Sequence, residues 1–284
     1  MATQSTLTMV LDIDSTLIGD LLDKETGRDE ITKELGEDFA QAYTLEVIGY
    51  PFPLYIGVPE LLRALWQQNV RIAFFSSGTQ KRNDLVVPAL LQHAFGEQAD
   101  TVKEQVAIYS RHHCIDTDKL TKEQKEQVQP EFSDTFHGWL KKDLRTIYSD
   151  PHLLRNTALM DDGASYMYRG QEKNFLYVNG NYGHVMERER IAIKQGEEPE
   201  QLDDLRCCFY HIFYGYGVFQ RAVRLMQQET GLYLDDALYR VQVEQENATF
   251  DKGFYYPGKK RFALYQEGLQ ALQVINPQLD FVRP

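Results

Sequence analysis

Three short apolar runs that each end in polar residues constrain the fold of this chain more than any other feature of its sequence. The runs are LTMVL (7–11) before Asp12 and Asp14, NVRIAFF (69–75) before Ser76 and Ser77, and NTALM (156–160) before Asp161 and Asp162. Such runs are typical of strands in a parallel sheet that is covered on both faces. Paired carboxylates at a strand end repel each other and resist desolvation, so we expect a positive partner beside them.

Helical patterns alternate with these runs. Residues 59–68 (PELLRALWQQ) carry their leucines and tryptophan on one helical face, and residues 81–95 have a second helical pattern that contains Pro88. Residues 106–115 (VAIYSRHHCI) alternate as a strand does. Strands alternating with helices predict a doubly wound, three-layer α/β/α sandwich with a mainly parallel sheet. The ligand site of such a fold lies at the carboxyl ends of the strands, so the polar strand ends should meet in one crevice.

The α/β pattern does not extend over the whole chain. We expect residues 1–186 to form the α/β core, with a polar surface insertion at 116–137, and residues 187–284 to form a mainly helical C-terminal region. We interpret the acidic pairs Asp203–Asp204 and Asp235–Asp236 in that region as exposed helix acids.

The charge balance limits the partners of the chain. Asp and Glu number 42 against 30 for Lys and Arg, a formal net charge of −12. This excess disfavours general binding to nucleic acid or to an anionic membrane, because both are polyanions. An anionic substrate would need a local basic pocket or a metal ion.

The cysteine pattern bears on the redox state of the compartment in which the protein works. Cys114, Cys207 and Cys208 form neither a CxxC pair nor a disulfide framework, which is typical of a reducing environment. No basic start followed by an apolar stretch opens the sequence. We therefore expect a cytoplasmic protein.

The polar strand ends supply what phosphoryl transfer needs in a chain without a P-loop. Asp12 can be the nucleophile that forms an aspartyl-phosphate, and Asp14 can protonate the leaving oxygen and later deprotonate the attacking water. Mg²⁺ prefers hard oxygen ligands, which predicts Asp12 and Asp162 as carboxylate ligands and the backbone carbonyl of Asp14 as a third. Ser76 and nearby amides would hold the phosphoryl group, and Lys142 would neutralise the crowded acids.

The order DxDxT, serine, lysine and an apolar run closing in two aspartates resembles the haloacid dehalogenase (HAD) superfamily of phosphohydrolases. The segments WLKKDLRTIY and NTALMDDGASYMY resemble the branch that contains the RNA polymerase II C-terminal-domain phosphatases and the NLI-interacting-factor-like phosphatases. FFSSGTQKRNDLVVPALL and YSRHHCI resemble the Phe-Thr-Ala-Ser segment and the Arg-x-x-Cys strand of that branch. The resemblance covers roughly residues 7–180 and leaves the insertion at 116–137 unmatched.

The resemblance implies a role for each matched residue. Asp12 would be the nucleophile, Asp14 the acid/base, Ser76 the hydroxyl of the second motif and Lys142 the lysine of the third. Asp162 would bind the metal directly, with Asp161 supporting it from the second shell of the site. The residues assigned to substrate binding are Thr16, Ser77 and Arg111.

The sequence departs from the pattern of the branch at three places, and the identity of the lysine is open at a fourth. Ser76 stands where the family often has Thr, and Asp162 stands where this branch often has Asn. YIGVPELL replaces the usual Arg-Pro-Gly lead-in, so any role of that arginine is lost. Lys141 is adjacent to Lys142 and remains a rival for the lysine role.

Spacing bears on the substrate. The stretches from Asp14 to Ser76 and from Ser76 to Lys142 are too short for the large caps that enclose small metabolites in many relatives. A minimal cap predicts an open site, which suits a phosphorylated protein side chain. Family resemblance favours phosphoserine or phosphothreonine over phosphotyrosine.

Two other functions remain open at this stage. A small-molecule phosphatase could use the C-terminal region as a lid, and a non-catalytic binding module could keep the fold for partner recognition. The complete set of acids, hydroxyl and lysine opposes the second. A receiver-type signalling domain is opposed by the order of the motifs, because its acidic pair comes first in the chain.

Overall fold

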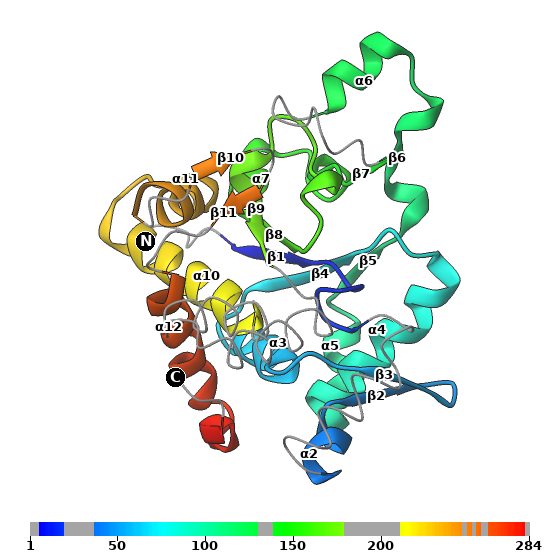
Figure 1. Ribbon diagram of the computed structural model, residues 1–284, viewed down its shortest axis with the longest axis vertical. Coiled ribbons are helices and arrows are strands. Elements are labelled where there is room, and N and C mark those ends of the chain that lie inside the picture. The colour runs from blue at the N-terminus through cyan, green and yellow to red at the C-terminus, as the bar shows by residue number, and fades with distance from the viewer. Residues whose placement is uncertain are drawn as a thin grey trace, which may run out of the picture.

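The computed structural model describes most of the chain, arranged as a central sheet with helices packed on it (Figure 1). The described residues are 6–19, 37–129, 139–178, 211–245, 249–251, 254–256 and 261–281. No helix within these ranges is both long enough and apolar enough to span a bilayer.

The central sheet has five strands, all parallel. In spatial order they are β5 (Ala107–Tyr109), β4 (Arg71–Phe75), β1 (Thr8–Leu11), β8 (Thr157–Asp161) and β9 (Phe175–Tyr177). The first strand lies in the middle, so the chain adds strands on one side of it and then on the other. This reversal of strand order is where ligands bind in doubly wound folds. The predicted fold class is confirmed.

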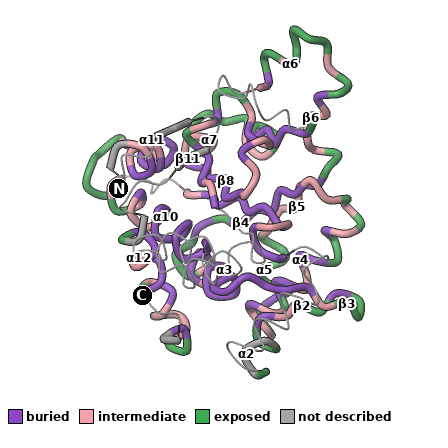
Figure 2. The backbone as a smooth tube through the Cα atoms, in the orientation of Figure 1, coloured by how far each residue is buried: buried purple, intermediate pink, exposed green. Residues whose placement is uncertain are grey.

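The remaining elements surround this sheet. The helices are α2 (Glu37–Ala42), α3 (Val58–Gln67), α4 (Gln80–Phe95), α5 (Ala99–Lys103), α6 (Lys122–Val128), α7 (Pro151–Arg155), α10 (His211–Gln228), α11 (Leu234–Tyr239) and α12 (Arg261–Gln273). Three antiparallel pairs of strands are β2 (Thr44–Val47) with β3 (Tyr50–Pro53), β6 (Ile115–Asp116) with β7 (Leu140–Lys141), and β10 (Thr249–Asp251) with β11 (Phe254–Tyr256). The insertion expected at 116–137 contains the mostly exposed helix α6 in its described part (Figure 2).

Alternating side chains of the strands enter two hydrophobic clusters, one on each face of the sheet. Met9 and Leu11 of β1 pack in the larger cluster with residues of α3, α4, α10 and α12. Val10 packs on the other face with Phe75 and Leu144. Burial on both faces explains why these strands read as nearly continuous apolar runs.

One strand prediction is wrong in its extent. The expected strand 106–115 is interrupted, since residues 107–109 form β5 and Ile115 already belongs to β6. Ser110 then begins a short 3₁₀ turn over Arg111–His113, because its side chain and that of His113 form a capping box. A local side chain to backbone bond therefore ends the strand.

The C-terminal helices share the core of the sheet. Residues of α10, α11 and α12 belong to the same hydrophobic cluster as β1 and β4. Gly217 of α10 and Gly268 of α12 let the two helices touch, since a Cβ on either would lie 1.8 Å from a carbonyl oxygen of the other helix. The predicted boundary at residue 186 lies outside the described residues, and the division into 1–186 and 187–284 stays a prediction.

Candidate active site

Lys142 and two aspartates form a buried ion cluster where the strands end. The Nζ of Lys142 lies 2.6 Å from Oδ1 of Asp12 and 2.5 Å from Oδ2 of Asp161. The Lys142 side chain has no exposed surface, and Asp12 is 4% exposed. Burial alone would lower the pKa of Lys142, but the charges of Asp12 and Asp161 and their hydrogen bonds raise it overall. This is the positive partner that the crowded acids require.

The structure distinguishes the two adjacent lysines. Both side chains are buried, yet Lys141 donates from Nζ to the carbonyl oxygen of Ser165, at 2.5 Å, and contacts none of the acids. Neighbouring side chains on extended backbone point in opposite directions, so only one can enter the cluster. Burial lowers the pKa of Lys141 to about 8. Lys142 is therefore the lysine of the acidic site.

Three carboxylates gather closely enough to share a cation. Each of Asp12, Asp161 and Asp162 offers an oxygen, and these atoms lie within 4.8 Å of one another. Three carboxylates beside one ammonium leave an excess of negative charge, and hard oxygen donors of this kind fit Mg²⁺. Burial is the main cause that raises the pKa of Asp12, and burial followed by the charge of Asp161 raises the pKa of Asp162 to about 7.

The hydrogen bonds of the two adjacent aspartates differ. Asp161 has both oxygens engaged, Oδ2 with Lys142 and Oδ1 with the backbone N–H of Gly163 at 2.7 Å. The Oδ1 of Asp162 accepts a long contact from the Thr16 hydroxyl, at 3.5 Å, and no lysine or arginine of the described ranges forms an ion pair with it. This difference agrees with Asp162 as the direct ligand and Asp161 as its support. The predicted backbone carbonyl ligand from Asp14 remains a prediction.

Thr16 joins the loops that follow β1 and β8. Its hydroxyl accepts the backbone N–H of Asp162 at 3.1 Å and lies 3.5 Å from Oδ2 of Asp12. Its carbonyl oxygen accepts from Nε2 of His211, at 2.8 Å, so the first residue of α10 supports the same loop. Thr16 is fully buried. The structure thus places it between two carboxylates, whereas the sequence suggested contact with substrate, which stays a prediction.

Asp14 lies at the more exposed edge of the site, with Ser76 and Arg82. The Ser76 hydroxyl lies 3.2 Å from Oδ2 of Asp14, and Gly78 donates its N–H to that hydroxyl at 2.9 Å. Arg82 pairs with both oxygens of Asp14, including a 3.1 Å bond from Nη1 to Oδ2. The Asp14 side chain is 45% exposed.

Arg82 is the site residue that sequence reasoning missed. From the sequence, Arg111 was assigned to substrate binding and Arg82 was given no role. The available signal was its place in the first turn of the helix that follows the second strand end, where Thr79 caps α4. A side chain there faces the carboxyl ends of the strands.

Ser77 and Arg111 lie beside this edge. The Ser77 hydroxyl donates to the hydroxyl of Tyr166 at 3.3 Å, and the Tyr166 ring centre lies 4.8 Å from Nζ of Lys142. Arg111 donates from Nε to the Ser77 carbonyl at 2.8 Å and lies over the ring of Trp139. The assignment of Ser77 and Arg111 to substrate binding remains a prediction.

Comparisons with known proteins give distant structural matches. No protein-family model and no curated protein matches the sequence. A variant of the fission yeast RNA polymerase II CTD phosphatase Fcp1 bound to beryllium fluoride is 15% identical, with a TM-score of 0.36, and the match covers 86% of this chain and 65% of that one. A structure of Fcp1, an essential RNA polymerase II CTD phosphatase, is 14% identical, with a TM-score of 0.35, covering 86% of this chain and 64% of that one.

This chain therefore spans less than two thirds of the length of either Fcp1 chain. Fcp1 is an RNA polymerase II CTD phosphatase, and the sequence motifs resemble the branch that contains such phosphatases. Both TM-scores are below 0.5, so the likeness to these two structures assigns no function to this chain.

Proposed function

We propose that this protein is a Mg²⁺-dependent phosphoprotein phosphatase of the HAD type that acts through an aspartyl-phosphate on Asp12. The observation that carries the proposal is the buried contact of Lys142 with Asp12 and Asp161, with Asp162 in the same group of carboxylates. A structural ion pair needs one acid for one lysine, whereas this cluster gathers three acids around one lysine. Such an arrangement suits a site that receives a cation and a phosphoryl group.

In the first proposed step, a carboxylate oxygen of Asp12 attacks phosphorus and the bond from phosphorus to the leaving oxygen breaks. The leaving oxygen takes a proton from Asp14. Ser76 Oγ and Lys142 Nζ donate to the phosphoryl oxygens as their negative charge develops. Asp14 is ion-paired with Arg82 in the structure, the incoming phosphoryl oxygens compete for that guanidinium, and the freed Asp14 carboxylate takes up a proton from solvent before it protonates the leaving oxygen.

In the second step, Asp14 takes a proton from a water molecule. The water oxygen bonds to phosphorus, the bond from phosphorus to the Asp12 oxygen breaks, and inorganic phosphate and the free carboxylate are restored. Asp12 and Asp162 would hold the cation, with Asp161 behind them. When bound, Mg²⁺ offsets the negative charge of the acids and of the phosphoryl group.

The proposed substrate is a phosphorylated side chain on a protein, with phosphoserine or phosphothreonine preferred. The half-exposed Asp14 and the exposed Arg111 support an approach from open solvent. A panel of phosphopeptides, sugar phosphates and nucleotides tests this choice. Hydrolysis of the small molecules alone would mean that the substrate is a metabolite and not a phosphoprotein.

The decisive variant is Asp12→Asn. We expect it to abolish hydrolysis of an aryl phosphate, because an amide is not a nucleophile for phosphorus, while the circular dichroism spectrum stays unchanged. Asp100→Asn on the exposed surface of α5 is the matched control and should keep full activity. Retained turnover in the Asp12 variant excludes Asp12 as the nucleophile.

Removal of the metal tests the cofactor separately. EDTA should abolish phosphatase activity and added Mg²⁺ should restore it, because without a cation the carboxylates repel an anionic substrate. Ca²⁺ is a useful comparison, since it takes more ligands in a more flexible geometry. Activity that is indifferent to both EDTA and Mg²⁺ contradicts a metal-dependent mechanism.

A further inference from the structure

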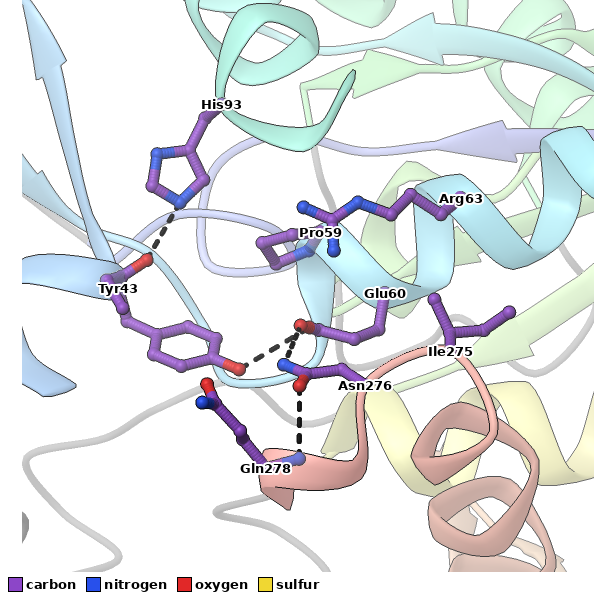
Figure 3. A pocket seen from close by; sticks show the side chains of 9 residues that line it. Tyr43, Pro59, Glu60, Arg63, His93, Ile275, Asn276 and Gln278 are labelled. Atoms are coloured by element: carbon purple, nitrogen blue, oxygen red, sulfur yellow. Dashed lines mark hydrogen bonds between the residues drawn. The ribbon is translucent and has the colours of Figure 1, made fainter. Parts of the chain in front are cut away.

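A cavity of about 470 Å³ lies between α3, the end of α4, the residues before β2 and the turn that follows α12 (Figure 3). None of its lining residues belongs to the acid cluster. Its volume falls in the range of pockets that hold small organic molecules. Two charged side chains of α3, Glu60 and Arg63, line it.

Glu60 is a buried carboxylate with neutral partners. It is 2% exposed, its Oε1 accepts from Nδ2 of Asn276 at 2.8 Å, and its Oε2 accepts from the Tyr43 hydroxyl at 3.4 Å. Asn276 is itself oriented by the backbone N–H of Gln278, at 3.1 Å. In the described part of the chain no lysine, arginine or histidine forms an ion pair with Glu60. A carboxylate has about four acceptor positions, so Glu60 keeps capacity for further donors.

The guanidinium of Arg63 lines the same cavity. Its Nε donates to the carbonyl of Ala94 at 2.5 Å, and that bond fixes the side chain. Its two terminal nitrogens donate to no group among the described residues. Figure 3 shows the guanidinium pointing into the pocket over Pro59, while the Glu60 carboxylate points toward Tyr43 and Asn276. A free guanidinium fork matches the geometry of a carboxylate.

Glu60 and Arg63 stand three residues apart on one helix and still do not pair. Each charge therefore remains available to a ligand. A simple anion bound at Arg63 would share the cavity with the like-charged Glu60 carboxylate. A simple cation bound at Glu60 would share it with the like-charged guanidinium of Arg63. A molecule with one charge of each sign satisfies both.

We propose that this cavity binds a small zwitterion, a free amino acid whose ammonium donates to Glu60 and whose carboxylate accepts from Arg63. Pro59 and Ile275 line the same cavity and offer apolar surface to the carbon chain. The site is separate from the proposed phosphatase centre and does not depend on it.

The test uses the full-length protein with glycine, β-alanine and γ-aminobutyrate, which separate the two charges by increasing lengths. Acetate and methylamine serve as fragments with a single charge. Isothermal titration calorimetry should show that at least one zwitterion binds, and that each fragment binds at least about tenfold more weakly. The chain length of the zwitterion that binds most tightly indicates the distance between the Glu60 carboxylate and the Arg63 guanidinium.

Two variants locate the binding. Arg63→Gln should weaken the best zwitterion at least about tenfold, whereas Arg71→Gln, an exposed arginine at the start of β4, should leave it unchanged. Glu60→Gln should cause a similar loss, with Glu97→Gln on the exposed surface as its control. Circular dichroism and thermal melting confirm that each variant is folded. If Glu60→Gln does not fold, the methylamine and acetate titrations still test the need for both charges.

Three results would overturn the proposal. They are the absence of binding by all three zwitterions, binding of a zwitterion that Arg63→Gln leaves within about twofold of the unchanged protein, and equal binding of acetate or methylamine. Equal binding of one fragment would mean that the cavity recognises a single charge.

Discussion

The part of the chain that the structure describes contains the same acidic dipeptide in two settings, Asp161–Asp162 at the end of β8 and Asp235–Asp236 in the first turn of α11. The first pair faces Lys142, which has no exposed surface. The second pair binds two surface cations. Arg155 donates from Nε to Asp235 at 3.1 Å and also pairs with Asp236, which lies 2.8 Å from Nζ of Lys173.

The two settings move the carboxylate pKa values in opposite directions. Burial and the charge of Asp161 raise the pKa of Asp162, whereas the hydrogen bond from Lys173 lowers the pKa of Asp236. The same residue types therefore form a crowded acidic site at the strand ends and a pair on α11 that Arg155 and Lys173 neutralise. The expectation that both acids of the α11 pair are exposed is wrong for Asp235, which is 8% exposed, and Asp203–Asp204 lies outside the described residues. Desolvation decides which outcome occurs.

The largest effect should come from Lys142→Met. Removing one partner of a buried ion cluster leaves uncompensated carboxylates and costs about 3–5 kcal/mol in the free energy of unfolding. Urea denaturation at pH 8 measures this loss. The loss should shrink at pH 5, because Asp12, whose pKa is raised, can then take a proton.

The surface setting supplies the matched control. Lys173→Met removes an ammonium that is half exposed and should cost less than about 1 kcal/mol. Equal losses in the two variants would contradict the distinction between the buried Lys142 and the half-exposed Lys173.

A second, intermediate effect concerns pH. The raised pKa of Asp162 means that the folded state holds this proton more tightly than the unfolded state. Stability in metal-free buffer should therefore fall as the pH rises from the unfolded value near 4 toward about 7. After discounting for partial exposure, we expect a fall of about 1–2 kcal/mol.

Asp162→Asn should flatten this dependence, and Mg²⁺ should oppose the fall in the unchanged protein, because it binds the ionised carboxylates. Urea denaturation in EDTA between pH 4.5 and 8 gives the profile. A profile that the substitution leaves unaltered would assign the pH dependence to other groups.

The smallest effect should come from Asp236→Asn. Its pKa is lowered in the folded state, so its contribution is present above the unfolded value and is lost only as the pH falls through the folded value. At pH 7 the substitution should cost about 0.2–1 kcal/mol, and high salt should reduce that cost. A cost that does not depend on salt would point to lost packing instead.

Much of the fold follows from local pattern. The run before Asp12 is apolar at every position that faces either hydrophobic cluster, and the parallel sheet follows from that continuity. The extent of β5 was mispredicted, because a periodic pattern does not show that Ser110 caps the following turn. Local hydrogen bonding overrode the alternation of side chains.

In the candidate site, too, some residues follow from local pattern and others do not. Asp12 and Asp161 were named from their place at strand ends, Lys142 was named as the positive charge that the acids need, and the structure joins the three. Arg82 was not singled out, because its contact with Asp14 crosses from α4 to the loop after β1. A contact between side chains so distant in the chain has no local signal.

The amino-acid sequence alone indicated the strands before Asp12, Ser76 and Asp161, their polar ends and the chemistry proposed for them, because periodicity and residue type act over a few neighbouring positions. Only the tertiary structure decided that Lys142 and not Lys141 reaches the acids, that Arg82 holds Asp14, and that α10 shares the core of the sheet. These choices depend on which direction each side chain takes in three dimensions, and burial then sets the energy of the charges brought together.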